Sequence, residues 1–504
     1  MLEALLQGLT AVLQWNAFSF MLIGIGVGFF VGLLPGLGGG TTLALMLSFV
    51  FKMEPIQAFA FLLGMHSVTA TTGDITSILF GIPGEGTTAA SILDGHAMAK
   101  KGEAGRALGA SLMSSLVGAV VGAAALALAV PVVRPLVLTF GSPELFMVAV
   151  LGIASIASLS GGGERAMLRG FLAGCLGLMV AAVGPDPQSG VLRYTFGQLY
   201  LWDGLELVPV LVGFFAIPEI IDLAVRKTAI AGTASVGRLS GVLEGVKDTF
   251  RHFWLTLRCS LVGTWIGVLP GLGGAVAQWM AYAHAVQSAK TPEDRARFGT
   301  GDVRGVIGPG AANNSKEGGD LIPTIAFGVP GSSSMAILLG AFFLVGLVPG
   351  PDMLTKHLAV TFSMVWTIVV ANVITVAASF VFLNQLARLT SIRGELLIPF
   401  LLFLTFIGSY TAHNSLGDIV VTLVFGLLGY VMVRYRWPRA PLVLGLVLGN
   451  IVERYLWIST ARYGLTWLGR PAVIIIFLAA VAVMVSALAQ QRRARHARGA
   501  AHAG

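Results

Sequence analysis

The sequence has 504 residues, of which 56% are hydrophobic and 11% are charged, and its mean hydropathy is +0.84. Soluble domains carry about twice that charged fraction, so the composition excludes a water-soluble globular protein. The net charge of +8 does not indicate nucleic-acid binding, because the basic residues form short clusters between long neutral apolar segments.

These apolar segments predict an all-α polytopic membrane protein. Each approaches or exceeds the ~20 residues with which a helix crosses the hydrocarbon core. The N-terminal segment 4–51 is longer and is interrupted in its middle by proline and glycine. The same length rule predicts roughly 11–12 membrane elements, some of them broken or re-entrant. The uncharged segments are 107–133, 145–163, 358–386 and 471–491.

The basic clusters predict the orientation of the chain. Lys and Arg beside membrane spans mark the cytoplasmic side. The clusters are therefore expected in the cytoplasm, together with the C-terminus. No Lys or Arg precedes the first apolar run, so a signal peptide is not expected. The clusters lie at 226–258, 290–304, 434–439 and 492–498.

An internal repeat divides the chain. The segment 28–39, Gly-Phe-Phe-Val-Gly-Leu-Leu-Pro-Gly-Leu-Gly-Gly, recurs in related form at 263–274, and Phe-Gly-Ile-Pro-Gly at 80–84 recurs as Phe-Gly-Val-Pro-Gly at 327–331. Two matches in the same order indicate duplication. The predicted parts are a first membrane repeat 1–222, a cytoplasmic linker 223–253, a second membrane repeat 254–489 and a basic cytoplasmic tail 490–504.

The two repeats are expected to have inverted topology. Equivalent loops carry opposite basic content: residues 1–16 have no Lys or Arg, whereas the approach to the second repeat has six. After the second motif the bias reverses, with Lys100, Lys101 and Arg106 following the first copy and only Lys356 following the other. Inverted repeats of this kind recur in secondary transporters.

The first motif pair predicts broken helices. Proline removes a backbone donor and glycine lowers helix propensity. Unpaired backbone groups cannot face lipid, so each break must lie inside protein. A new half-helix offers N–H groups that suit an anion, and the ending half-helix offers carbonyls that suit a cation. The residues concerned are Pro35, Gly36, Gly38, Gly39, Gly40 and Thr41, and their counterparts Pro270, Gly271, Gly273 and Gly274.

Two alternatives accompany this interpretation. The preceding glycines, spaced Gly-x-x-x-Gly in both copies, could simply allow close helix packing. A phosphate-binding loop is excluded, because the motif lacks its Lys-Ser/Thr ending and a preceding strand.

The second motif pair places hydroxyl groups directly after a break. Hydroxyls and half-helix amides together can hold a carboxylate. Upstream of the second copy, Asn313 and Asn314 can serve either Na⁺ or a carboxylate through their amide groups, or they can form an Asn-rich cap. The candidate residues of this pair are Pro83, Gly84, Glu85 and Thr87 in the first copy, and Pro330, Gly331, Ser332 and Ser333 in the second.

Acidic residues near the breaks are further candidates. Asp74, Glu85, Asp94 and Asp320 would cost a few kcal/mol if unpaired at mid-membrane, so Glu85 could help bind a cation or a proton. The simpler interpretation places each of them in a solvated loop. No resident metal or cofactor is expected, because the histidines His66, His96, His284 and His413 lack metal-ligand spacing and the two cysteines suit packing.

These motifs together resemble the large membrane subunit of the tripartite tricarboxylate transporter family over nearly the whole chain. The resemblance rests on 32–39, on Ile-Pro-Gly at 82–84 followed by Asp-Gly-His-Ala-Met-Ala-Lys-Lys-Gly at 94–102, on 190–197, on 311–314 and on 328–331. It implies a bacterial inner-membrane symporter that uses Na⁺ or H⁺. It also implies citrate-like or other carboxylate substrates, a periplasmic receptor and a small membrane subunit of about four helices.

The chain departs from the family pattern at three places. Family members often have Glu where this chain has Gly310, which puts coordination of an ion by that carboxylate in doubt. Lys316 and Glu317 are unusual and could alter the preference for substrate or ion. Glu85 stands where other members often have a neutral residue.

The resulting hypothesis is a site where the broken elements of both repeats meet. A substrate carboxylate is expected near Thr41, Thr87, Ser332 and Ser333, and a cation near the Pro-Gly carbonyls and Asn313 or Asn314. Two other classes remain open. One is a channel with filter loops. The other is an intramembrane enzyme that uses Asp74, His66 and Glu85. It is less favoured, and an enzyme is not expected, because it requires these side chains to converge and because neither the repeat nor the paired breaks would be expected of it.

Overall fold

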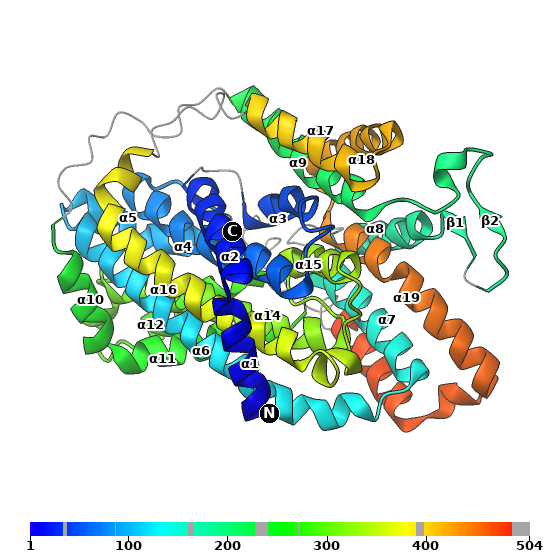
Figure 1. The fold of residues 1–504 in the computed structure, drawn as a ribbon. Helices are drawn as coiled ribbons and strands as arrows, with labels where there is room; N and C mark the ends of the chain where they lie inside the picture. The colour runs from blue at the N-terminus through cyan, green and yellow to red at the C-terminus, as the bar shows by residue number, and fades with distance from the viewer. Residues whose placement is uncertain are drawn as a thin grey trace, which may run out of the picture.

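The structure, a computed structural model, describes residues 1–33, 38–85, 87–159, 166–186, 188–226, 240–270, 273–389 and 398–485. Nearly all secondary structure in these ranges is helical (Figure 1). The exception is a short hairpin of β1 (Gly184–Pro185) and β2 (Leu192–Arg193), which pair antiparallel. The predicted all-α polytopic fold is confirmed.

The first half of the chain contains nine α-helices within the described ranges. They are α1 (Leu2–Leu13), α2 (Trp15–Gly32), α3 (Gly39–Leu47), α4 (Pro55–Phe80), α5 (Ile92–Lys100), α6 (Ala104–Leu138), α7 (Ser142–Leu159), α8 (Ala166–Ala181) and α9 (Leu207–Arg226), with 3-10 helices η1 (Thr88–Ser91) and η2 (Leu199–Leu201).

The second half continues through α10 to α19. These helices are α10 (Val242–Arg251), α11 (Phe253–Val268), α12 (Gly273–Gln287), α13 (Pro292–Arg295), α14 (Arg304–Phe327), α15 (Ser333–Leu344), α16 (Leu358–Leu389), α17 (Ile398–His413), α18 (Leu416–Arg434) and α19 (Ala440–Tyr463), with 3-10 helices η3 (Pro351–Leu354) and η5 (Thr466–Gly469) and a last apolar helix, Pro471–Val485.

Six described helices are long and apolar enough to cross a membrane by length and composition: α2, α6, α9, α16, α18 and α19. Shorter apolar helices such as α11 and α15 accompany them. The chain is therefore a multi-pass membrane protein. The segment that was predicted as a linker is partly helical, because α10 forms within it and packs against α6.

Two long helices rich in polar residues, α4 and α14, lie in the protein interior. Most residues of α4 and nearly all of α14 between 305 and 326 are buried. The helices α2 and α16 pack against α4, and α6, α11 and α12 pack against α14. Polar groups cannot face hydrocarbon without cost, so the apolar helices shield these two from lipid.

Glycines allow this close packing. A methyl group at Gly28 would lie 2.4 Å from the carbonyl oxygen of Met65 on α4, and one at Gly267 would lie 2.5 Å from that of Lys316 on α14. The close-packing interpretation of the Gly-x-x-x-Gly segments is therefore confirmed in both copies.

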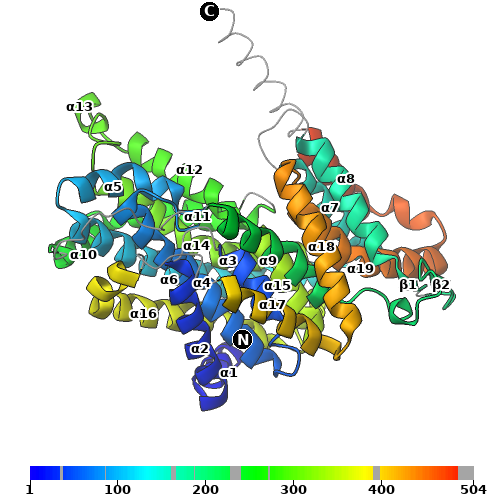
Figure 2. The same cartoon turned by 90° about the horizontal axis from the view of Figure 1, so that it is seen from above.

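The helices form two groups (Figures 1 and 2). The first contains α1, α2, α4 to α6, α10 to α12, α14 and α16, and the second contains α7 to α9 and α17 to α19. The short helices α3 and α15 lie between the groups: α3 contacts α4, α9 and α17, and α15 contacts α4, α9 and α19. Both of these short helices begin directly after a predicted break.

Candidate functional site

All four predicted helix interruptions are present. The helix α2 ends at Gly32 and α3 begins at Gly39, while α11 ends at Val268 and α12 begins at Gly273. The helices α4 and α14 end at Phe80 and Phe327, directly before their Gly-x-Pro-Gly segments. Three predicted residues, Pro35, Gly36 and Gly271, lie outside the described residues.

The second motif pair ends its helices in the same way. Gly81 and Gly328 both have φ 68° and ψ 19°, a left-handed conformation in which their N–H groups close the last helical turn. Glycine adopts this conformation without the steric penalty of a Cβ atom, so it is the usual residue at such a C-terminus. After the second copy, Ser332 begins α15 by accepting a hydrogen bond from the Met335 N–H group.

The first interruption faces two ionisable side chains of the first half. A methyl group at Gly39 would lie 2.7 Å from Nδ1 of His66 and 3.4 Å from Oε1 of Glu85. One at Gly40 would lie 3.4 Å from Oγ of Ser334 on α15. The start of α3 therefore meets the region that follows the fourth interruption.

The second interruption faces the polar centre of α14. A methyl group at Gly274 would lie 2.3 Å from Cε of Lys316 and 2.8 Å from Cγ2 of Thr87, which follows the third interruption. At Gly331, after the fourth, a methyl group would lie 2.9 Å from Oδ1 of Asp320. The predicted convergence of the four interruptions is confirmed.

At this meeting point lies a charged cluster, formed by His66, Glu85, Lys316, Glu317 and Asp320. The ammonium of Lys316 is 2.5 Å from Oε1 of Glu317 and 3.8 Å from Oδ2 of Asp320. The other oxygen of Glu317 is 3.3 Å from Nε2 of His66. All but Glu85 are buried almost completely.

The charged cluster has more acceptors than donors. Burying a charge costs several kcal/mol unless it is paired. Glu317 is paired on both sides, but neither oxygen of Asp320 has a hydrogen-bond partner within the described protein. The same holds for Oε2 of Glu85 and Oγ1 of Thr87. Chemically, such an arrangement can accept a further proton or a small monovalent cation.

Glu85 occupies the N-terminus of α3. Its Oε1 accepts a hydrogen bond of 3.2 Å from the N–H group of Gly39, the first residue of that helix. Free N–H groups at a helix start favour an anion. A carboxylate of the protein therefore lies where the sequence predicted half-helix amides to meet a substrate carboxylate.

The other predicted residues differ in their surroundings. Thr41 is buried within α3, and Thr87 has a buried hydroxyl without a partner in the described protein and lies with its methyl carbon next to Gly274. Ser332 is buried and caps α15, whereas Ser333 is exposed. Pro83 is exposed, while Gly84 and Pro330 are buried.

Asn313 and Asn314 connect three helices about one turn before Lys316. The Asn313 amide donates to the carbonyl oxygen of Ala70 on α4 at 2.9 Å, and the Asn314 amide donates to Thr71 at 2.7 Å and to Asn372 on α16. The Oδ1 atoms of both asparagines are buried without a donor in the described protein. Both side chains thus retain free acceptors.

Gly310 explains how α14 approaches α6. A methyl group there would lie 2.4 Å from Oγ of Ser114 and 3.1 Å from the carbonyl oxygen of Ser111 on α6, so a glutamate at this position would at least displace the Ser114 side chain. Nearby, Asp74 accepts a hydrogen bond of 2.9 Å from Ser111, and its Oδ1 has no partner in the described protein.

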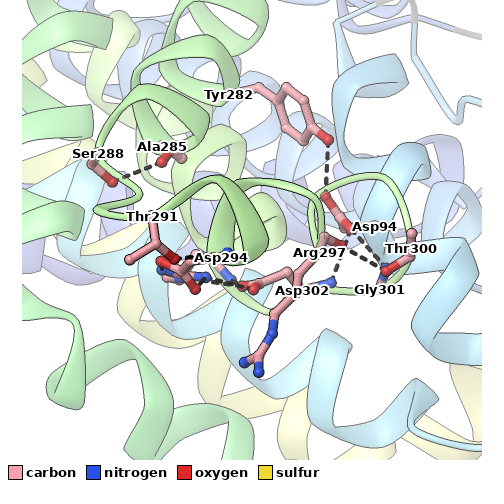
Figure 3. Close-up of polar contacts among 11 residues, drawn as sticks. Asp94, Tyr282, Ala285, Ser288, Thr291, Asp294, Arg297, Thr300, Gly301 and Asp302 are labelled. Atoms are coloured by element: carbon pink, nitrogen blue, oxygen red, sulfur yellow. Dashed lines mark hydrogen bonds and ion pairs between the residues drawn. The ribbon is translucent and has the colours of Figure 1, made fainter.

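The solvated-loop interpretation is wrong for Asp74, Asp94 and Asp320, which are all buried. Asp94 on α5 instead holds the segment before α14 (Figure 3). It accepts hydrogen bonds from the N–H groups of Gly301 and Asp302 at 2.8 and 2.9 Å, and from the hydroxyl of Tyr282 at 2.9 Å. These bonds fix a segment of the second half on the first half.

Sequence reasoning did not include His66, Lys316, Glu317 or Asp320 among the predicted binding residues. A signal was present, since Lys-Glu-Gly-Gly-Asp at 316–320 lies between two breaks in a stretch without other charges, 305–351. Their partner His66 is far away in sequence and had no recognisable spacing.

The fold and the site define a class of protein. A multi-pass helical membrane protein with interrupted helices around an interior polar site is typical of membrane transporters. Residues 18–444 match the family described as the tripartite tricarboxylate transporter TctA family. The chain belongs to this family and is therefore a transporter subunit.

Two relatives come from Agrobacterium vitis. An uncharacterized 52.8 kDa protein of the TAR-I ttuC' 3' region is 31% identical over 436 residues, which cover 86% of this chain and 85% of the relative. An uncharacterized protein of the TAR-II ttuC' 3' region is 34% identical over 194 residues, which cover 38% of this chain and 79% of the relative.

Proposed function

We propose that this chain is the membrane permease subunit of a receptor-dependent secondary symporter that imports small organic anions, tricarboxylates or other carboxylates, together with Na⁺ or H⁺. The observation that carries the proposal is the charged cluster between the four interruptions. A buried, acceptor-rich cluster that both halves build is suited to bind a coupling cation and release it when the halves move.

The substrate carboxylate binds at the start of α3 and among the nearby hydroxyls. The N–H groups at Gly39 and Gly40 favour an anion there, and Thr87 and Ser332 add hydroxyls from the third and fourth interruptions. Glu85 leaves Gly39 when the substrate enters, because two carboxylates cannot share one helix start. The cation binds near the free oxygens of Asp320, Asn313 and Asn314.

Alternating access moves the two groups of helices relative to each other. The short helices α3 and α15 lie between the groups and carry the interrupted ends, so a relative movement changes which side reaches the site. The two halves are inverted repeats in the bacterial inner membrane, and the C-terminus is cytoplasmic. A periplasmic receptor delivers the substrate, and a small membrane subunit completes the complex.

Uptake by the reconstituted complex tests this function. The chain, its receptor and its small subunit are placed in proteoliposomes, and a panel of labelled carboxylates beginning with citrate is offered under imposed Na⁺ or H⁺ gradients. We expect at least one carboxylate to accumulate above its external concentration and to leak out when an ionophore collapses the gradient. Equilibration without accumulation would instead indicate a channel.

Two substitutions test the site. Asn313→Ala and Ser332→Ala should lower receptor-dependent uptake while the complex still assembles. The control is Thr10→Ala, which removes an exposed hydroxyl that bonds only to its own helix at Gln7. Uptake that is unchanged in both site variants would contradict the assignment of these residues.

A further inference from the structure

Two side chains of the charged cluster can carry a positive charge, His66 and Lys316. The charge of His66 depends on protonation of its imidazole, whereas that of Lys316 is carried by an ammonium group. The Lys316 side chain is buried, and its route passes directly over Gly274, where a methyl group would overlap Cε and Cδ at 2.3 and 2.9 Å. With a larger residue at this position, the lysine side chain would have to take another route to the cluster. The Lys316 side chain therefore reaches the charged cluster by passing next to the second helix interruption.

The surroundings of the ammonium are those of a small cation. Its Nζ atom lies 2.5 Å from one carboxylate and 3.8 Å from another, Glu317 and Asp320. A methyl group at Gly274 would lie 2.8 Å from Cγ2 of Thr87 and 2.3 Å from Cε of Lys316, so the methyl carbon of Thr87 and the lysine stem are neighbours. Carboxylate oxygens are ligands that hard cations prefer, and a lysine ammonium acts as a compact point charge.

Resting on the proposed symport function, we infer that the Lys316 ammonium is a tethered cation that fills the monovalent-cation position of the transport site, so that this chain does not bind Na⁺ there. Of the two coupling ions that symport allows, this position can then take up H⁺ but not Na⁺. The titratable groups that face Lys316 are Glu317 and Asp320 on α14, His66 on α4 and Glu85 after α4.

Binding of radioactive sodium to the purified full chain tests the inference without any substrate. In wild type we expect no saturable sodium binding above that seen with excess unlabelled Na⁺. In Lys316→Met, an apolar side chain of similar length leaves Glu317 and Asp320 without their ammonium, and we expect saturable binding of about one sodium ion per chain. Added Na⁺ should also raise the melting temperature of this variant relative to choline, since a ligand of the folded state stabilises it.

The matched control is Lys356→Met. Lys356 is exposed and pairs with Asp352 at 3.1 Å, so its loss removes a lysine and an ion pair that lie outside the charged cluster. This variant should bind no sodium. Lys316→Gln is a second variant for the case that Lys316→Met does not fold, because the glutamine amide can still donate a hydrogen bond to Glu317. This variant should also gain sodium binding.

Saturable sodium binding by wild type would overturn the inference, and so would a folded Lys316→Met or Lys316→Gln chain that binds none. Failure of this inference can be distinguished experimentally from failure of the proposed symport function. Uptake driven by Na⁺ in wild type would remove the inference and keep symport, whereas gained sodium binding without any carboxylate uptake would remove symport and keep the tethered cation.

Discussion

The helix pairs α2–α4 and α11–α14 share a backbone arrangement but differ in charge. A methyl group at Gly84 would lie 2.6 Å from Cα of Gly73 on α4, and one at Gly331 would lie 2.7 Å from Cα of Asp320 on α14. The two contacts have the same spacing in sequence, so Asp320 stands where the first half has a glycine.

The same alignment sets Thr69 and Ala70 against Lys316 and Glu317. The first half therefore holds small or neutral side chains at the positions where the second half is charged. What the first half contributes to the charged cluster comes from elsewhere, through His66 and Glu85. The comparison teaches that the helix interruptions build the frame of the site, whereas the charges that determine its chemistry lie mainly on one helix.

The largest expected effect concerns the shared frame. Gly32→Val and Gly267→Val should each prevent folding, because methyl groups there would lie 2.7 Å and 2.5 Å from carbonyl oxygens of α4 and α14. We expect losses above about 5 kcal/mol, among the largest effects of single substitutions. Size-exclusion profiles of the solubilised chain measure this. Gly26→Ala is the control, since no atom of the described residues lies within 4 Å of a methyl group there. If only one half were sensitive, the helix frames of the two halves would not be equivalent.

The next effect concerns the charges that distinguish the halves. Glu317→Gln leaves Lys316 and His66 without their shared carboxylate, and breaking a buried ion pair costs about 3–5 kcal/mol. Thr69→Val, at the position equivalent to Lys316, removes a hydroxyl that bonds only to Met65 of its own helix in the described protein and should cost about 1 kcal/mol. Thermal unfolding of both variants checks the contrast, and similar costs would show that the charged cluster contributes no more than an ordinary hydrogen bond.

A smaller effect concerns Glu85 at the start of α3. Glu85→Gln removes a negative charge from the place where a substrate carboxylate is proposed to bind, so the KM for an anionic substrate should fall. Charges near a helix start contribute about 0.3–1 kcal/mol, which corresponds to roughly 2–5-fold in KM. Uptake kinetics measure this, with the exposed Glu293→Gln as the control. A higher KM would mean that Glu85 assists the substrate.

The smallest effect lies outside the membrane-spanning segments, in the segment that Asp94 holds. Hydrogen bonds from Arg304 keep the pKa of Asp294 below its ordinary value. Because the pKa of the Asp294 carboxyl is lower in the folded protein than its ordinary value near about 4, its ionised form stabilises the fold above that pH. This contribution is lost as the pH falls through the lowered pKa. Arg304→Met should remove this contribution to folding stability at neutral pH. Because the segment is then held less firmly, trypsin should cleave faster at Arg295 and Arg297. Lys290→Met serves as a control for loss of a basic residue in the same segment.

Much of the frame was readable from the sequence. Proline and glycine at 35–39, 83–84, 270–274 and 330–331 act on the local backbone, so a single sequence reveals where the helices end. The convergence of the breaks also followed, because broken ends must avoid lipid. The charged cluster did not follow, since His66 and Glu317 meet only through tertiary packing of α4 on α14.

The same limit applied to single acidic residues. A solvated loop position is the simpler sequence-based interpretation of Asp94, yet its three donors come from residues 282–302. The burial of this carboxylate therefore depends on partners that are far away in the sequence. The inverted orientation of the two halves stays a prediction.

The most direct test of the account compares two activities of Asp320→Asn in the reconstituted complex, using the carboxylate that wild type accumulates best. If the charged cluster carries the coupling ion, this variant should still exchange labelled for unlabelled substrate across the membrane but should no longer accumulate it under an imposed ion gradient. Accumulation at the wild-type level would contradict the claim that this cluster couples ion to solute.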